Sequence, residues 1–292
     1  MNENFDSSPE TAPKPSKASY LERYTQPDSV EMTFHDLKIL HPEDFTPPED
    51  YLEYAEQMQK KVQDFFGTKP KRPFLLSFVY KGEDWKQRKA YRAGPLKQKL
   101  GKDIIVLGVD KEHPELPPYA KDSFAHEYTH VVFDEWIHGD KKGLVNRYIS
   151  EGIAEYVSKH VFGEEISGRQ EDFIQRANNY LSKHKDFQPE QFLRPDKINS
   201  KLLDTGDSKE DSMLEEVPYN LGPYIVQKLF ERLDKNQLKG FFQEAVLTDE
   251  EVPKEELTQT VRAKSAEAFR KYLKMNPEEV YKWLSDGLKS SE

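Results

Sequence analysis

The sequence reads Phe-Ala-His-Glu-Tyr-Thr-His-Val-Val-Phe-Asp-Glu-Trp at residues 124–136, and this stretch governs the interpretation of the whole chain. Its apolar residues recur at spacings of three and four, which is typical of a helix with one face against a core. The helix is expected to follow the two prolines at 117–118. His126 and His130 lie four residues apart, so both imidazoles project from the same side of that helix.

Two imidazoles one helical turn apart can share a metal ion, which is the physical basis of the His-Glu-x-x-His motif. Glu127 directly follows His126 and can reach a water bound to that ion. Zinc lowers the pKa of its water toward ~7, and a neighbouring carboxylate can then take the proton. The motif therefore predicts a hydrolytic metal site. The simpler interpretation is a helix with two surface histidines.

A catalytic zinc ion needs a third protein ligand and an open position. A histidine six residues after His130 is ruled out because residue 136 is tryptophan, and a thiolate is ruled out because the chain has no cysteine. A glutamate from a following helix is the third known pattern, and residues 150–156 (Ser-Glu-Gly-Ile-Ala-Glu-Tyr) fit it. Twenty residues separate His130 from Glu151, enough for a turn and a return to the metal.

Residues 126–130 followed by 149–154 (Ile-Ser-Glu-Gly-Ile-Ala) resemble the gluzincin metallopeptidases. The most similar group is the peptidase MA-like one, related to thermolysin and the aminopeptidase-N family, and the resemblance covers about residues 100–235. It implies a zincin-like fold and one zinc ion per chain, held by His126, His130 and Glu151. It also implies that Glu127 acts first as a base and then as an acid.

The same resemblance suggests two supporting residues. Glu155 lies four residues beyond Glu151, where the thermolysin branch carries a carboxylate that fixes the tautomer of a ligand histidine, here expected to be His126. Residues 217–222 (Val-Pro-Tyr-Asn-Leu-Gly) resemble the stretch that supplies a tyrosine donor for the developing oxyanion. Tyr219 is thus the expected donor, with Tyr224 as the alternative. A solvated Glu155 and a core Tyr219 are the competing interpretations.

One departure from the family pattern bears on the activity. Aminopeptidase relatives carry a Gly-x-Met-Glu-Asn strand that binds the free amino end of the substrate, and residues 103–109 with their flanks contain no such motif. The expected activity is therefore that of an endopeptidase rather than an aminopeptidase. The strand at 103–109 could still bind an extended peptide or protein substrate by β-strand addition.

Two other functions fit the same residues. A zincin-fold protein without catalytic activity could bind partners, although such proteins usually lose a member of the site. A metallohydrolase could use zinc and a carboxylate base on an acyl substrate that is not a peptide, and only analogy of fold favours peptides. The remaining histidines have no partner at ligand spacing and are expected to be surface or structural residues: His35, His41, His113, His138, His160 and His184.

The pattern along the first half of the chain predicts helices and strands. Apolar residues at helical spacing run from Tyr51 to Phe66, with Gly67 as the stop. Apolar runs at 73–80 and 103–109 predict strands. A sheet followed by helices indicates an α+β fold.

The second half is expected to be mainly helical. A helix is predicted from Arg147 to Phe162, with Gly163 as its stop, and a closing helix from Pro277 to Leu288. The expected architecture is a small mixed or antiparallel sheet with the active-site helix, followed by a mainly helical C-terminal part.

Three regions are predicted from composition. Residues 1–47 are expected to be a disordered leader or spacer, 48–250 the zincin-like catalytic domain, and 251–292 a C-terminal helical extension packed on it. The net charge of −10 disfavours nucleic acid and anionic membranes as partners. No transmembrane segment is expected. A polar leader suits a lipid-anchored, exported protein, with a cytoplasmic location as the alternative.

Overall fold

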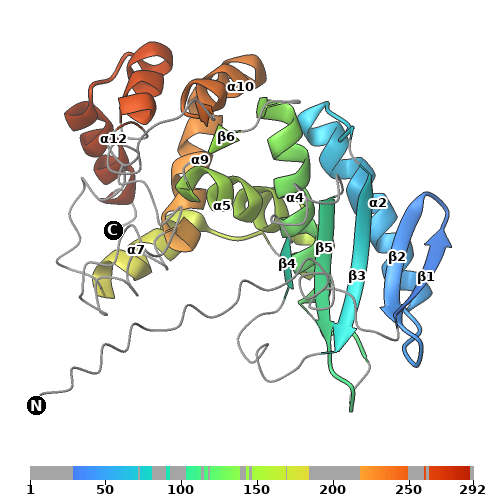
Figure 1. Cartoon of the computed structure of the whole chain (residues 1–292). Coiled ribbons are helices and arrows are strands. Elements are labelled where there is room, and N and C mark those ends of the chain that lie inside the picture. The colour runs from blue at the N-terminus through green and yellow to red at the C-terminus, as the bar shows by residue number, and fades with distance from the viewer. Residues whose placement is uncertain are drawn as a thin grey trace, which may run out of the picture.

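The computed structural model describes residues 29–71, 73–80, 90–92, 103–112, 115–117, 119–138, 143–144, 147–168, 170–183, 218–248, 260 and 263–289. These residues form an α+β fold, as the sequence predicted. The sheet and its covering helices occupy one side of the molecule and the C-terminal helices occupy the other (Figure 1).

The sheet has five strands in the order β1-β2-β3-β5-β4. Their bounds are Ser29–Phe34, Leu37–Pro42, Phe74–Tyr80, Asp103–Val109 and Ala90–Arg92 for β1, β2, β3, β5 and β4 in that order. β2, β3 and β5 run parallel, while β1 and β4 pair antiparallel at the two edges. The sheet is therefore mixed, and the strands predicted at 73–80 and 103–109 are confirmed.

Strands β1 and β2 lie within the range 1–47 that was predicted to be a disordered leader, and for residues 29–42 that prediction is wrong. Alternate residues of β2 point into the core, with Leu37 and Ile39 nearly completely buried. Such an alternation is a strand signal, but the charged and polar residues between the apolar ones lower the mean hydropathy of the segment. Residues 1–28 lie outside the described part of the chain.

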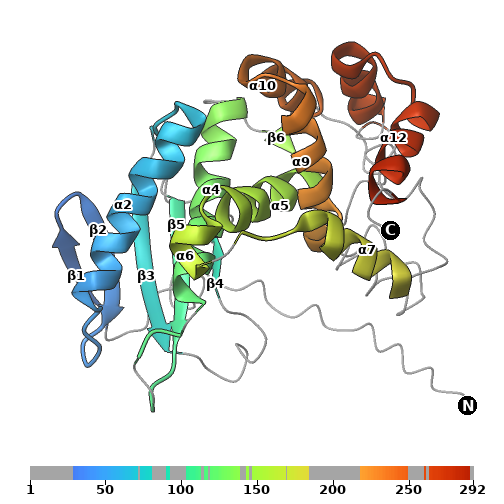
Figure 2. The ribbon, with the colours of Figure 1, turned by 180° about the vertical axis from the view of Figure 1, so that it is seen from behind.

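Helices α2 (Glu49–Phe66) and α4 (Ala120–His138) cover one face of the sheet (Figure 2). α2 ends as predicted at Gly67, whose φ of 65° is in the left-handed region that glycine adopts without strain. Aromatic side chains join the two helices to the sheet. The Tyr51 ring contacts Phe78 of β3 at 6.0 Å and Phe124 of α4 at 6.4 Å between centroids. This packing fixes α4 against the sheet.

The helix predicted from Arg147 to Phe162 is an α-helix only as far as Tyr156. α5 (Arg147–Tyr156) continues as a π-helix, η2 (Val157–Val161), in which Phe162 N donates to Val157 O at 3.1 Å. Gly163 was predicted as the stop and this is wrong, because it is the first residue of α6 (Gly163–Ser167). The stop is Gly168, with a φ of 73°. The wider π turn allows the chain to enter a second helix without a glycine break.

The rest of the described chain is mainly helical, as expected. It contains α7 (Phe173–Lys183), α9 (Gly222–Arg232), α10 (Lys235–Glu244), η4 (Phe269–Leu273) and α12 (Pro277–Lys289), with a short pair of strands, β6 (Gly143–Leu144) and β7 (Leu247–Thr248). The closing helix predicted at 277–288 is confirmed. Within the described residues, no helix is both long and apolar enough to cross a membrane.

Candidate metal centre

Two helices bring three ligand atoms together. α4 supplies Nε2 of His126 and Nε2 of His130, which lie 3.3 Å apart. α5 supplies Oε2 of Glu151, which lies 3.2 Å from His126 Nε2 and 3.4 Å from His130 Nε2. Within the described residues these three form a group able to hold a metal ion. The three residues predicted as ligands therefore converge on one point.

The spacing of these atoms suits zinc. For zinc bonds of ~2.0–2.1 Å, the ligand atoms of a tetrahedral site lie about 3.3 Å apart, and the three observed separations match that edge length. Their side chains retain 10–16% of their exposure, so the group is recessed but still reachable from solvent. A site with three protein ligands that is open to solvent can bind a substrate or water as the fourth ligand.

The charges at the site stabilise one another. Burial alone would lower the pKa of His126, but hydrogen bonds to Glu151 and Glu155 and the charge of Glu127 raise it well above its usual value. Burial likewise opposes ionisation of Glu151, yet the adjacent His130 and His126 hold the pKa of its carboxyl well below the usual range. A divalent cation between these atoms would take over the positive charge that protonated histidine otherwise supplies.

Glu155 lies behind His126, as the spacing along α5 predicted. Its Oε1 is 3.3 Å from His126 Nδ1. Its Oε2 accepts from Arg176 at 2.7 Å and from Lys159 at 2.8 Å. The carboxylate is almost fully buried, and burial alone would raise its pKa, but His126, Lys159 and Arg176 lower that pKa far below its usual value. Glu155 is thus an ionised acceptor that can hold the proton of His126 on Nδ1 and leave Nε2 for the metal.

His130 has a corresponding partner that the sequence did not reveal. Ser150 Oγ lies 3.1 Å from His130 Nδ1. The serine directly precedes Glu151, so one turn of α5 supplies both a ligand and a support for another ligand. The adjacency to Glu151 could have suggested this role. For Arg176, by contrast, no local signal exists, because α7 reaches Glu155 only through the folding of the whole chain.

Glu127 lies half-buried on α4, next to the ligand His126. Its carboxylate makes no hydrogen bond or ion pair with another residue in the described ranges, in contrast to Glu151 and Glu155. A carboxylate without such partners can accept and return a proton.

The two candidate tyrosines differ in their surroundings. The ring of Tyr219 stacks against His126, with centroids 6.5 Å apart and planes inclined by 25°. Tyr224, the alternative, is completely buried, and its hydroxyl donates to Leu284 O of α12 at 2.6 Å. Tyr224 therefore has a structural role, whereas Tyr219 lies beside the metal ligands.

A close contact between α5 and α9 places these tyrosines. A Cβ added at Gly152 would lie only 2.6 Å from both the carbonyl carbon and the oxygen of Gly222. The absence of a side chain at Gly152 thus lets α9 cross directly over α5. Gly152 follows the ligand Glu151, and Gly222 begins the helix that follows Tyr219. The crossing therefore brings the tyrosine to the metal ligands.

The strand predicted to bind an extended substrate is not available for that purpose. The central residues of β5 pair with β3 on one side and with β4 on the other, at Ile105, Val106 and Leu107. A substrate was expected to pair with residues 103–109 as an added strand. For the central residues of β5 this expectation is wrong, because both of their edges already pair with other strands of the sheet. The sheet edge on this side belongs to β4.

Three of the histidines expected to be surface or structural residues have a polar partner. His35 Nδ1 lies 2.8 Å from a Glu56 carboxylate oxygen, His41 Nδ1 lies 2.8 Å from Pro42 O, and His160 Nδ1 lies 3.3 Å from Glu171 O. His138 is the last residue of α4. His113 and His184 lie outside the described residues.

Neither a scan of the sequence against protein-family models nor a search among curated proteins finds a match. The chemistry open to the site therefore has to follow from its own residues. They provide two imidazole nitrogens, one carboxylate ligand, a second carboxylate without a hydrogen-bond or ion-pair partner among the described residues, and an adjacent phenol.

Proposed function

We propose that this chain is a zinc-dependent metallopeptidase with a zincin-like catalytic fold, and that it acts as an endopeptidase. The observation that carries the proposal is the triangle of His126 Nε2, His130 Nε2 and Glu151 Oε2, with sides of 3.2–3.4 Å. Glu127 adjoins that triangle without a competing partner. The family resemblance of the two helical motifs supports the same reading.

The residues divide the chemistry between them. Zinc, when held by His126, His130 and Glu151, supplies a Lewis acid that lowers the pKa of a water toward ~7. Glu127 accepts the proton of the attacking water and later returns it to the leaving amine. The Tyr219 hydroxyl donates to the oxygen that becomes negative as the carbonyl carbon is attacked.

A variant of the proposed base tests this mechanism. We expect Glu127→Gln to retain one zinc per chain, because Glu127 is not a ligand, and to lower hydrolysis of an internally quenched peptide library by at least ~10³-fold. Metal content by mass spectrometry and turnover on the same preparation are the two readouts. Glu135→Gln, a matched change about two turns farther along α4, should leave both nearly unchanged.

The outcomes separate the proposal from its rivals. Full activity in Glu127→Gln refutes the mechanism. A zinc-loaded wild type that is silent on the library and on acyl esters would identify a binding protein, and cleavage of esters alone would identify a hydrolase of another acyl class. Peptides blocked at both ends should be cleaved as well as free ones. A strict need for a free amino end would make the enzyme an aminopeptidase.

A further inference from the structure

Five side chains form a closed network of contacts that begins and ends at the imidazole of His126. Glu155 Oε1 lies 3.3 Å from His126 Nδ1, and the other oxygen of that carboxylate accepts from Arg176 Nη1 at 2.7 Å. Arg176 Nε donates to Asn220 Oδ1 at 3.4 Å. Asn220 directly follows Tyr219, whose ring stacks on His126 and completes the network. The network therefore joins α4, α5, α7 and the segment before α9.

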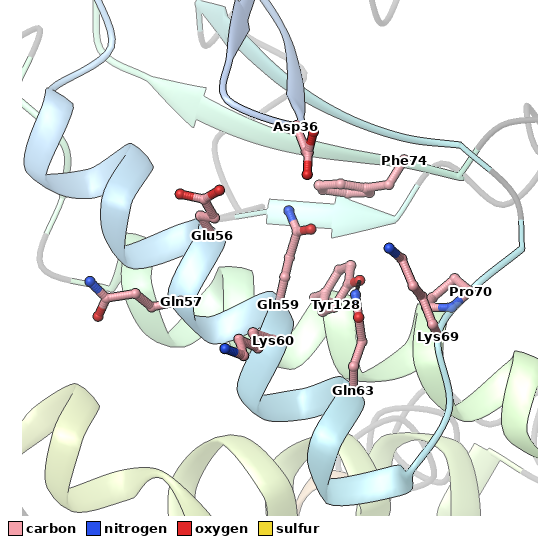
Figure 3. A pocket seen from close by; sticks show the side chains of 10 residues that line it. All are labelled: Asp36, Glu56, Gln57, Gln59, Lys60, Gln63, Lys69, Pro70, Phe74 and Tyr128. Carbon is pink, nitrogen blue, oxygen red and sulfur yellow. Dashed lines mark hydrogen bonds between the residues drawn. The ribbon is translucent and has the colours of Figure 1, made fainter.

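The helix that carries His126 is held on its opposite side by α2. Tyr128 lies two residues from each ligand histidine, which turns it away from the metal centre. Its hydroxyl accepts from Gln63 Nε2 of α2 at 2.6 Å, beside a cavity of about 660 Å³ (Figure 3). Because α4 is fixed from that side, the position of Tyr219 relative to the imidazole depends on the other members of the network.

The start of α7 fixes the place of the arginine in the network. Asp172 caps this helix, since its Oδ1 accepts from the backbone N–H groups two and three residues later, both at 3.0 Å. One residue earlier, Glu171 N donates to Lys159 O of η2 at 2.9 Å. The first turn of α7, which contains Arg176, is thus attached to the same helical segment that follows the metal ligand of α5.

Two cations pair with Glu155, but they lead to different parts of the molecule. Lys159 Nζ lies 2.8 Å from Glu155 Oε2, nearly the same distance as Arg176 Nη1. The second ion pair of Lys159, at 3.9 Å, is with Asp122 and leads back to α4. Lys159 can therefore neutralise Glu155 without Arg176. What the guanidinium adds is the bond to Asn220, because it donates from separate nitrogens to two acceptors.

We propose that Arg176 is a positioning residue, which places the Tyr219 hydroxyl beside the metal centre by linking Asn220 to the carboxylate that supports His126. When this link is cut, residues 218–220 are free to shift while the three metal ligands stay in place. The effect of this shift on hydrolysis rests on the proposed function. The placement of the Tyr219 ring does not, so the two can be tested separately.

The ring current of Tyr219 at the His126 protons measures the placement without any substrate. Proton NMR of the zinc-loaded full chain gives this shift, with Tyr219→Leu as the reference that lacks it. Arg176→Met and Asn220→Ala should each lose most of the shift. The zinc content and the signals of the other histidines show that each variant is folded.

Two further variants separate the link from the charge. Lys159→Met is the matched control, because it also removes one cation from Glu155 but leaves the bond to Asn220, and it should keep the shift. Arg176→Lys retains a positive charge but not the planar fork, and it should lose the shift as Arg176→Met does.

Turnover gives the second readout. Arg176→Lys and Asn220→Ala should each lower kcat on the quenched peptides ~10-fold, with KM within about twofold of wild type, because the donor to the oxyanion is misplaced and substrate binding is not. The double variant should be no slower than the slower single variant, since both changes break the same link.

The proposal is overturned if Arg176→Lys keeps the wild-type shift, if Lys159→Met loses as much of it as Arg176→Met, or if the losses in kcat multiply in the double variant. A zinc-loaded wild type that hydrolyses no peptide refutes the proposed function instead. The NMR shift then still decides whether Arg176 places Tyr219.

Discussion

At the scale of single residues, the metal centre is a set of charges whose balance depends on pH. Glu151 and Glu155 flank His126 on both ring nitrogens, at 3.2 and 3.3 Å. Arg176 and Lys159 in turn neutralise Glu155. Both carboxylates therefore stay ionised, and in the absence of metal they favour a protonated His126.

This balance predicts the pH dependence of zinc binding. The pKa of His126 is raised above 6.5 when the metal is absent, so at pH 7 a proton occupies the nitrogen that zinc must use. Zinc affinity should therefore keep rising with pH, by up to about tenfold per unit, until the raised pKa is passed. Competition with a chromogenic chelator from pH 6 to 8.5 measures it. Glu155→Gln should move the rise in zinc affinity to lower pH, because it removes a charge that raises the pKa of His126. A zinc affinity that does not change above pH 6.5 would show that His126 is not protonated there.

A site residue can be predicted from the sequence when its role depends on neighbours close to it in the chain. His126 and His130 were predicted because one helical turn relates them. Glu151 and Glu155 were predicted from the resemblance of the following helix to the gluzincin pattern. Ser150 and Arg176 were not predicted. The role of Arg176 depends on the path of α7 after η2 and α6, which no short pattern records. The cavity beside Tyr128 was also missed, because it lies between segments that are distant in the chain.

At the scale of secondary structure, the crossing of α5 and α9 links the ligand Glu151 to Tyr219. Gly152→Ala places a methyl group 2.6 Å from the Gly222 backbone, which cannot move as a side-chain end can. Overpacking of ~1–3 kcal/mol should exceed the ~1 kcal/mol that alanine gains in a helix. We expect a lower melting temperature and, because α9 must shift, at least ~10-fold slower peptide hydrolysis.

Gly240→Ala in α10 is the matched control for this variant. The added methyl there meets the ring end of Tyr272, which is a side chain that can rotate away. Its melting temperature should change less than that of Gly152→Ala, and its turnover should match the wild type. Equal activity in both variants would mean that the crossing does not position Tyr219.

The helices and strands also show which elements a local sequence pattern can predict and which it cannot. α2, α4, β3 and β5 were predicted nearly to the residue, because apolar periodicity and a left-handed glycine at 67 mark them clearly. β1 and β2 were missed because an edge hairpin needs only one apolar face. The π-helix at 157–161 was missed because an extra residue in one turn leaves the apolar pattern almost unchanged.

At the scale of the whole molecule, the C-terminal helices belong to the structure that supports the site. The Tyr224 hydroxyl of α9 donates to Leu284 O of α12, and Phe241 of α10 contacts Phe269 of η4 at 5.1 Å between ring centroids. α9 also crosses α5 beside the ligand Glu151. The C-terminal part is thus joined to the metal-binding helices at two places, by α9 where it crosses α5 and by α10, whose Phe242 contacts Phe133 of α4 at 5.3 Å between ring centroids.

This arrangement predicts opposite phenotypes for two tyrosine variants that each lose one hydroxyl. Tyr224→Phe removes a buried hydrogen bond and should cost about 1 kcal/mol in unfolding free energy, with faster amide hydrogen exchange across 277–289 and near-normal turnover. Tyr219→Phe should keep the zinc content but lower turnover ~10²-fold, because the donor to the oxyanion is lost. Denaturant unfolding, hydrogen exchange and peptide hydrolysis on both proteins separate the two roles. If Tyr219→Phe hydrolyses peptides as fast as the wild type, the hydroxyl of Tyr219 takes no part in the reaction, and its ring only packs beside His126.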